Sequence, residues 1–246
     1  MRFRLGRRLR WAVGTVAVAV AIWLGASYAV SVKLTRRAQP QRDEPAAQLP
    51  WGTLESPRLS TSDGQELGAW FVEGRKDCPA VLILHGNGAN RGSCLDEAEL
   101  AASTGCAVLL ITLRAHGDST GETNDFGLGA RHDVLAAVEW LHGRCPDRPI
   151  VVWGQSLGSA AALFAAEALS NQIAGYILEC PYRDLRTATR NRTRMYLPPI
   201  LDQIAYAGFV VVAPAVVPNL DEISPLNVAS KVPATVPVLV LAGSVD

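Results

Sequence analysis

The sequence predicts an α/β fold in which a mostly parallel β-sheet is covered by helices on both faces. Three observations predict it. Short apolar runs alternate along the chain with segments of helical composition. These runs are apolar at consecutive positions, which is typical of strands that are buried on both faces. Polar, glycine-containing turns follow several of the runs, at the strand ends where parallel sheets gather functional residues.

The individual elements follow from this pattern in chain order. The predicted strands are Glu66 to Val72, Ala80 to Leu84, Ala107 to Leu113, Ile150 to Trp153, Gly175 to Leu178 and Val238 to Leu241. The predicted helices are Asp96 to Ser103, Arg131 to His142 and the alanine-rich segment Leu157 to Leu169. In the second helix Val134, Val138 and Leu141 recur at helical spacing, which indicates one buried face.

Composition limits the class of protein. The 246 residues suffice for one α/β domain and a small appendage. Apolar residues make up 49% and charged residues 19%, which indicates a globular chain and excludes a disordered one. Lys and Arg together number 23, and so do Asp and Glu, so the bulk charge gives no reason to expect a nucleic-acid partner.

The N-terminus has the pattern of a membrane anchor. Arginines crowd the first ten residues, and Trp11 to Val32 contains no charged residue. As a helix this run extends roughly 33 Å, about the thickness of the hydrocarbon core of a bilayer. Lys33, Arg36 and Arg37 follow it. Because the N-terminal flank carries more positive charge, we expect a single-pass protein of the plasma (inner) membrane, with its N-terminus in the cytoplasm and its domain extracytoplasmic.

A cleaved signal peptide is the main alternative for this segment, and it would release an exported domain. Ser27-Tyr28-Ala29 places small residues at two cleavage positions, but signal peptides have apolar regions of about 7–15 residues, shorter than this one. The pair Arg7-Arg8 lies in surroundings that match a twin-arginine signal poorly. The length of the uncharged run disfavours a buried helix of a soluble protein.

The predicted organisation has four parts and one insert. They are a basic cytoplasmic segment at 1–10, an anchor at 11–32, a polar linker at 33–55 and a domain at 56–246, with a cap insert at 183–232. The cap begins with arginines and continues with the apolar stretch Tyr196 to Val217, whose prolines and Asp202 argue against a second membrane span. A lid over an acyl pocket and a helix that only packs on the domain both remain open.

Ser156 is the first candidate for chemistry. It lies in Gly154 to Gly158, a Gly-x-Ser-x-Gly turn between the run Ile150 to Trp153 and the helix Leu157 to Leu169. This context exposes the serine above the sheet in a strained conformation, with the N–H groups and dipole of the helix directed at it. An ordinary turn serine, the alternative, does not require that strand and helix.

Acyl transfer also requires donors for an oxyanion. One candidate is the backbone N–H of Leu157, directly after the serine. The other is the backbone N–H of Asn87, in the loop His85 to Asn90, whose glycines let the backbone approach a substrate. The alternative is that this loop only makes a turn.

These segments resemble the serine-hydrolase branch of the α/β-hydrolase superfamily, which includes the serine aminopeptidase-like hydrolase domain and BEM46-like proteins. The resemblance covers roughly residues 55–246, and its segments are His85 to Gly88, Arg114 to Gly121, Gly154 to Gly158 and Pro237 to Asp246. In such proteins an aspartate usually stands before the arginine of the second segment and a glycine after it. Thr112 and Ala115 occupy those places here. That segment is structural in the family, so we expect catalysis to survive the departure.

The resemblance implies an α/β-hydrolase fold with Asp246 as the triad acid, which orients a histidine and stabilises its charged form. An arbitrary acidic residue at the chain end is the alternative. The triad order in this fold is Ser, then Asp or Glu, then His, yet all four histidines precede Ser156. We therefore expect a C-terminally truncated fold that ends before the catalytic histidine, as a fragment, a frameshift product or a natural truncation.

The sequence thus predicts a membrane-anchored serine hydrolase that cleaves an ester, thioester or amide through an acyl-enzyme on Ser156, and that is inactive as this chain. A non-catalytic remnant or binding domain of the same fold is the alternative. The expected partners are a small-molecule or acyl substrate and the membrane, with no nucleic acid and no metal or organic cofactor. Five widely spaced cysteines predict buried small residues and not a disulfide framework, although export would allow one bridge.

Overall fold

The apolar runs of the sequence form one eight-stranded sheet in the computed structural model, which describes residues 7–37, 41–44 and 49–243. The strands are β1 Leu54–Glu55, β2 Arg58–Ser60, β3 Glu66–Val72, β4 Ala80–Leu84, β5 Ala107–Ile111, β6 Ile150–Gln155, β7 Gly175–Glu179 and β8 Val238–Leu241. Their order is β1-β3-β5-β4-β6-β7-β8, with β2 paired to β3. All pairs from β5 to β8 are parallel, and those of β1, β2 and β3 are antiparallel. The predicted, mostly parallel sheet is confirmed.

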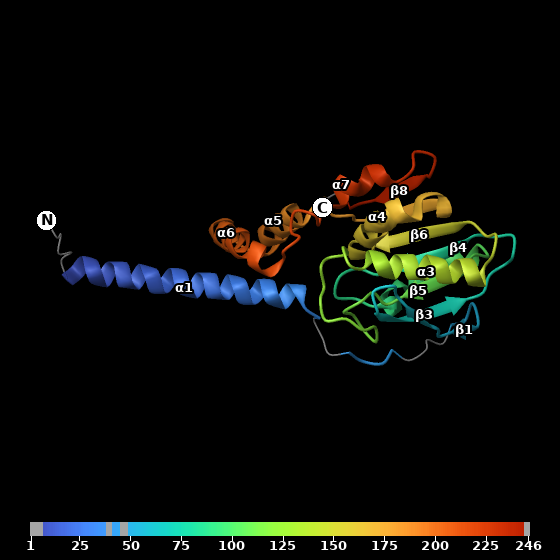
Figure 1. Cartoon of the computed structure of the whole chain (residues 1–246), viewed down its shortest axis with the longest axis horizontal. Helices are drawn as coiled ribbons and strands as arrows, with labels where there is room; N and C mark the ends of the chain where they lie inside the picture. The colour runs from blue at the N-terminus through green and yellow to red at the C-terminus, as the bar shows by residue number, and fades with distance from the viewer. Residues whose placement is uncertain (1–6, 38–40, 45–48, 244–246) are drawn as a thin grey trace.

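Helices cover both faces of this sheet (Figure 1). They are α1 Arg7–Thr35, α2 Leu95–Ser103, α3 Arg131–Arg144, α4 Leu157–Leu169, α5 Leu185–Tyr196, α6 Pro199–Val216 and α7 Pro225–Val228. Apolar side chains of α3 and α4 pack on one face in a cluster with Leu82 and Leu84 of β4. The other face carries Val81 and Ile83, which pack with Ala98 of α2. Side chains on the two opposite faces of β4 therefore pack against different helices, as expected for a strand that is buried on both faces.

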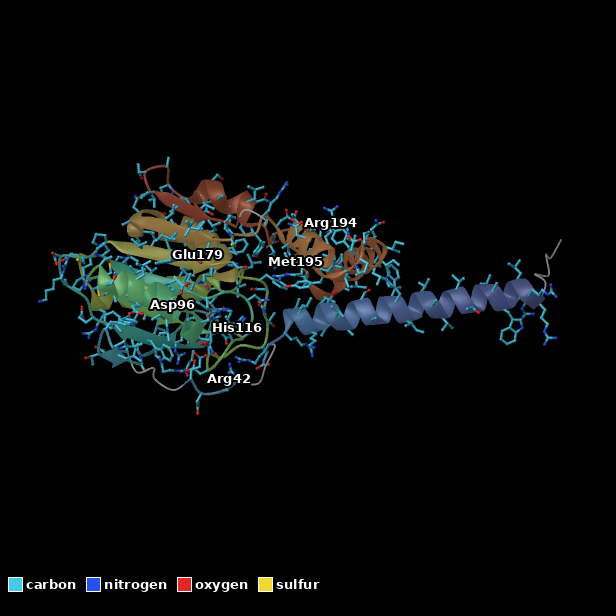
Figure 2. The ribbon with its side chains drawn as sticks, turned by 180° about the vertical axis from the view of Figure 1, so that it is seen from behind. Arg42, Asp96, His116, Glu179, Arg194 and Met195 are labelled. Atoms are coloured by element: carbon cyan, nitrogen blue, oxygen red, sulfur yellow. The ribbon has the colours of Figure 1, made fainter. Side chains whose placement is uncertain are left out.

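Helix α1 extends away from the sheet, and α5 and α6 lie beside it (Figures 1 and 2). The predicted apolar N-terminal helix is confirmed, and it runs to Thr35. By length and composition, both α1 and α6 can cross a membrane. The indole Nε1 of Trp23 on α1 donates to the carbonyl of Ile204 on α6 at 3.1 Å. The two helices are therefore packing partners.

The described part of the 33–55 segment packs on the domain. The guanidinium of Arg37 donates to the carbonyls of Gly117, Ser119 and Gly121, and the amide of Arg42 donates to Gly117 at 3.1 Å. At the end of α1, the amide of Asn124 donates to the carbonyl of Thr35 at 2.8 Å. These bonds fix the domain end of α1 to the loops that follow β5.

The strand β8 lies at one edge of the sheet, paired only to β7 among the described strands. All four of its residues are exposed. Cys78, Cys94, Cys106 and Cys145 are reduced thiols, and three of them are buried, as expected for small apolar residues.

Candidate active site

Ser156 lies at a sharp turn between β6 and α4, with φ 46° and ψ −98°. This is a left-handed conformation that a residue with a Cβ rarely adopts, and such strain collects at functional sites. Two backbone bonds hold it: the Ser156 amide donates to Glu179 O at 2.8 Å, and its carbonyl accepts from the Ala160 amide at 3.1 Å. The strand, turn and helix therefore present the half-buried Ser156 hydroxyl at the carboxyl edge of the sheet.

The two glycines of the turn allow α4 to begin directly against the sheet. A Cβ added at Gly154 would lie 2.5 Å from the Gly158 carbonyl carbon, and one added at Gly158 would lie 2.4 Å from Leu84 O. Since both obstacles are backbone atoms, neither glycine can be replaced without moving the helix start. This close packing directs the N-terminus of α4, with its unpaired N–H groups and positive dipole end, toward Ser156.

The Leu157 amide is the first of these helix N–H groups. The loop after β4 lies next to the same point, since a Cβ added at Gly86 would lie 3.9 Å from the Ser156 Cβ. Asn87 follows in this loop, and its side-chain Oδ1 accepts from Asn124 Nδ2 at 2.7 Å. The two segments that carry the predicted oxyanion donors, Leu157 and Asn87, are therefore brought together beside the serine.

Asn124 is a residue that the sequence reasoning missed. It is buried, and its amide bonds Thr35 at the end of α1 while its side chain bonds Asn87 in the loop His85 to Asn90, named the oxyanion loop for the role predicted for Asn87. A second bond in which the Phe126 amide donates to Asn124 Oδ1 at 3.2 Å fixes the orientation of the side-chain amide. The domain end of the apolar helix is thus two hydrogen bonds from the oxyanion loop. No local sequence signal marks this long-range link.

Neither His85 nor His116 can serve as a base, since both ring nitrogens of each are engaged. In His85, Nε2 accepts from the Leu113 amide at 3.0 Å, so Nδ1 carries the proton and donates to Gly86 O at 2.7 Å. In His116, Nε2 accepts from the Gly88 amide at 3.2 Å and Nδ1 donates to Arg114 O at 2.8 Å. Burial lowers the pKa of His85 to about 3 and also lowers the pKa of His116, so both stay neutral and structural.

The remaining two histidines, His132 and His142, lie on α3. His132 Nδ1 is 3.4 Å from Ser62 Oγ, in the turn before β3, and His142 is exposed in the last turn of the helix. The structure therefore brings none of the four histidines into the role of base for Ser156. Asp246, the predicted triad acid, lies outside the described residues, which end at Gly243 after β8.

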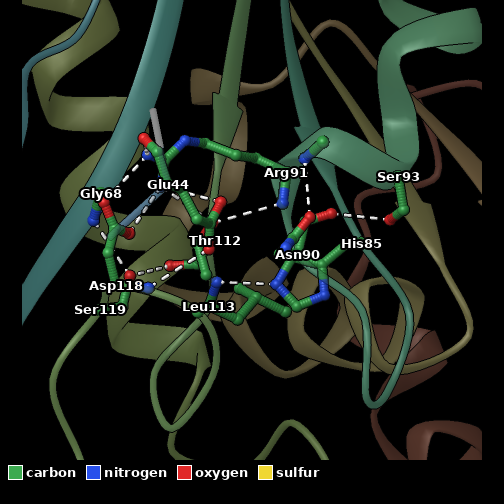
Figure 3. A network of polar contacts seen from close by, with 12 residues as sticks. Glu44, Gly68, His85, Asn90, Arg91, Ser93, Thr112, Leu113, Asp118 and Ser119 are labelled. Atoms are coloured by element: carbon green, nitrogen blue, oxygen red, sulfur yellow. Dashed lines mark hydrogen bonds and ion pairs between the residues drawn. The ribbon is translucent and has the colours of Figure 1, made fainter. Parts of the chain in front are cut away.

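A buried polar network joins Arg91, directly after the loop His85 to Asn90, to residues of the loop after β5 and to Glu44 (Figure 3). The guanidinium of Arg91 contacts the Asp118 carboxylate at 2.6 and 2.9 Å, and its Nη1 donates to Thr112 Oγ1 at 3.0 Å. Thr112 in turn donates to the Glu44 carboxylate, which also lies 3.3 Å from Arg91. Burial raises the pKa of Glu44, which Arg91 opposes. Glu44 thus supplies a carboxylate next to Thr112, where the resemblance leads one to expect aspartate.

Ala115, which stands where the family usually has glycine, is also explained by the structure. It has φ 59°, a value that favours glycine, and its amide donates to Thr120 O at 2.9 Å. The neighbouring Arg114 is held by Asp133 at 2.8 Å and by Asp63 at 2.6 Å. The segment therefore keeps the turn that the family's glycine would make, at the cost of backbone strain in one alanine.

A family model described as "alpha/beta hydrolase fold" matches residues 79–217. The chain is 30% identical over 157 residues to "Protein ABHD12B" of Homo sapiens, an alignment that covers 61% of this chain and 42% of that protein. It is 28% identical over 147 residues to "Lysophosphatidylserine lipase ABHD12" of Gallus gallus, covering 57% and 38%. The chain thus spans less than half the length of these two relatives.

Among solved structures, the Pyrococcus furiosus esterase Pf2001 superposes with a TM-score of 0.60. The superposition covers 81% of this chain and 76% of the esterase, at 23% identity. At that identity the likeness concerns the fold alone.

Proposed function

Since the chain belongs to the α/β-hydrolase fold family, we propose that it is a membrane-anchored serine hydrolase that cleaves an ester, thioester or amide through an acyl-enzyme on Ser156. The observation that carries the proposal is the Ser156 turn itself. A serine held at φ 46° between a parallel strand and a helix N-terminus is arranged to attack a carbonyl carbon.

In the proposed reaction, Ser156 Oγ bonds to the carbonyl carbon while a base removes the hydroxyl proton. The carbonyl oxygen then carries the negative charge, and the backbone N–H groups of Leu157 and Asn87 stabilise it. The alcohol, thiol or amine leaves with a proton, and water hydrolyses the acyl-enzyme. Support for this role comes from the position of Gly86 next to Ser156 and from the bond that orients Asn87.

The proposed triad is completed by Asp246 and a histidine that is none of the four in this chain. Because the reaction needs a base to activate the serine, we expect residues 1–246 by themselves to turn over substrate very slowly. The ring nitrogens of both His85 and His116 are engaged in structural hydrogen bonds, and this observation favours a second candidate function, a non-catalytic binding domain of the same fold.

The proposed substrate class is an acyl ester of a lipid. One relative is named a lysophosphatidylserine lipase, and an anchor at α1 would hold the domain at a membrane, where acyl lipids are the substrates at hand. We further propose that α1 anchors the protein with the arginine-rich N-terminus in the cytoplasm and the domain outside it, in the plasma (inner) membrane. A cleaved signal is the alternative.

Hydrolysis of p-nitrophenyl butyrate tests the function. Residues 1–246, the longest product of the same gene, and the Ser156→Ala variant of that product are compared. We expect kcat for residues 1–246 to be lower than for the longer product by about 10⁴- to 10⁶-fold, the usual effect of losing a triad member. Comparable kcat/KM for the two lengths would mean that another base serves Ser156. A gene that ends at residue 246 would favour the binding domain.

A further inference from the structure

The segment that contains α5 and α6 leaves the domain and returns to the same place. At its start, the amide of Leu185 donates to the carbonyl of Ile223, which follows α6, at 3.0 Å. Close by, the amide of Leu226 donates to the carbonyl of Arg183 at 3.1 Å. A segment whose two ends are bonded to each other does not cross a bilayer in a single pass, although α6 alone is long and apolar enough to do so.

Helix α6 exposes an apolar surface and hides its charge. Exposed apolar side chains lie on it, on the turn before it and at the end of α5: Tyr196, Leu197, Ile200, Leu201, Ile204, Val210 and Val211. The one charged residue of the helix, Asp202, is 4% exposed and lies 2.9 Å from the guanidinium of Arg190 on α5. An apolar exterior with its carboxylate buried and paired is suited to hydrocarbon and not to water.

The surface of α6 continues the exposed apolar surface of α1. Gly208 lies so close to α1 that an added Cβ would be 2.1 Å from Ser27 Oγ, and Trp23 bonds α6 one turn earlier. Small residues that let helix backbones approach are typical of packing within membranes. As counted from Thr35, Ser27 and Trp23 lie roughly 12 and 18 Å along the axis of α1, which is itself roughly 43 Å long. If α1 spans a bilayer of about 40–45 Å with its head groups, these contacts fall within the leaflet next to the domain.

Helix α5 has a different character and lies nearer the sheet than α6 does (Figure 1). It contains four arginines and no acidic residue. Arg192 and Arg194 near its end are exposed, and so is Met195; Figure 2 shows Arg194 and Met195 on the segment that contains α5 and α6. A basic helix between a folded domain and an apolar helix is placed at the depth of lipid phosphates, which attract arginine at close range.

We propose that α5 and α6 form a hairpin that inserts into the leaflet next to the domain, with α6 in the hydrocarbon beside α1 and the arginines of α5 at anionic head groups. The proposal rests on the membrane anchoring by α1 proposed above. It identifies the occupant of the exposed α6 surface as the lipid bilayer, because that surface is continuous with the surface of α1. The hairpin joins β7 to β8, at the carboxyl edge where Ser156 lies, so the substrate would enter the site from the membrane surface.

Quenching of a fluorophore by spin-labelled lipids tests the proposal. The full chain, with Cys106→Ser and Cys180→Ser, receives one new cysteine for a fluorophore and is reconstituted in phosphatidylcholine vesicles with or without phosphatidylglycerol. The positions are Ile200→Cys on α6, Val16→Cys on α1 and Leu100→Cys on α2. All three native side chains are exposed. Phosphatidylcholine with a doxyl group on its acyl chain is the quencher.

We expect the labels at Ile200 and Val16 to lose most of their fluorescence, while the label at Leu100 keeps it. Phosphatidylglycerol should increase the quenching at Ile200, and Arg192→Gln with Arg194→Gln should abolish that increase. Quenching at Val16 without quenching at Ile200 would overturn the hairpin proposal and leave the anchor intact. Absence of quenching at both positions would overturn both. If instead the Ile200→Cys side chains of two copies formed a disulfide and no quenching occurred there, the proposal would be overturned, because a second copy of the chain and not the bilayer would cover α6.

Discussion

At the scale of single residues, the candidate site depends on backbone geometry more than on side-chain chemistry. The sequence pattern was sufficient to predict a strained serine at 156, because two glycines and a small-residue helix allow little else at that turn. It could not predict that Asn124 orients Asn87, or that Glu44 lies beside Thr112. Both pairs are far apart in the chain, and only the assembled loops bring them together.

The Gly158→Ala variant tests the packing of the serine turn. Because the new Cβ would meet Leu84 O at 2.4 Å, we expect the free energy of unfolding to fall by about 2 kcal/mol or more, as is typical of overpacking against backbone. Gly143→Ala on α3 is the matched control, since no atom lies within 4 Å of its added Cβ. A gain of roughly 0.5–1 kcal/mol is expected there from helix propensity. Urea denaturation of the full chain in detergent measures both, and equal effects would contradict the account.

The buried histidines predict acid sensitivity. Burial lowers the pKa of His85 to about 3, below about 6.5 in the unfolded chain. Since the pKa of His85 is lower in the folded state, its contribution to the free energy of unfolding is fully present above about pH 6.5. This contribution is lost as the pH falls, because protons then bind the unfolded state preferentially. At about pH 5 the loss from this one group is about 2 kcal/mol. The lowered pKa of His116 acts in the same direction, whereas burial raises the pKa of Asp133 to about 6, which acts in the opposite direction over this pH range.

Urea midpoints at about pH 7 and about pH 5 measure this effect. His85→Gln should flatten the dependence on pH, because the amide does not titrate. His142→Gln, which changes an exposed side chain, should leave it unchanged. The reading of His85 as a neutral structural group would be wrong if the unchanged chain and His85→Gln differed in midpoint by the same amount at both pH values.

At the scale of elements, the sequence was most informative where an apolar run ends in a turn. Strands β3, β4 and β8 and helix α4 have the predicted bounds. A glycine follows each of these strands at the second position, and the polar residues Ser170, Asn171 and Gln172 follow the helix. Strands β1 and β2 were missed, since two or three residues carry no periodicity. The strand order, with β5 between β3 and β4, and the contact of α6 with α1 arise from long-range packing that periodicity does not encode.

The pair of Arg190 and Asp202 predicts the strength of the link between α5 and α6. Asp202→Asn would remove the carboxylate that pairs with the mostly buried Arg190 guanidinium, which also lies 5.1 Å from the Tyr206 ring. We expect the free energy of unfolding to fall by about 3 kcal/mol. Asp221→Asn is the control, because it breaks an exposed pair with Arg186, and it should cost less than about 1 kcal/mol. Thermal denaturation in detergent compares them, and equal costs would mean that the buried pair is not stabilising.

At the scale of the whole molecule, the structure joins the apolar helix to the domain more tightly than a polar linker suggests. Arg37 and Arg42 bond the loop around Gly117, and Thr35 accepts from Asn124 beside the oxyanion loop. The sequence predicted the apolar helix from its lack of charge. It did not predict these bonds, since a polar, proline-containing segment has the same sequence pattern whether or not it packs on the domain. The bounds of the anchor, linker, domain and cap stay predictions.

Membrane extraction tests the anchor. Because residues 11–32 of α1 carry no charge and are long enough to span a bilayer, we expect the protein to remain in the membrane fraction after alkaline carbonate treatment. Protease added to the extracytoplasmic side should degrade the domain, since the basic flank of α1 keeps the N-terminus inside. Release by carbonate would favour cleavage of a signal peptide, and protection of the domain would mean that the orientation is reversed.

The central claim, that Ser156 is the nucleophile, is tested most directly by locating its covalent adduct. The complete gene product is treated with a fluorophosphonate, digested and analysed by mass spectrometry, alongside Ser156→Ala and the control Ser103→Ala, which changes a serine on α2. The account predicts one adduct, on the peptide containing Ser156, present in the Ser103→Ala variant and absent from Ser156→Ala. An adduct that persists in Ser156→Ala, or that maps to another residue, would contradict it.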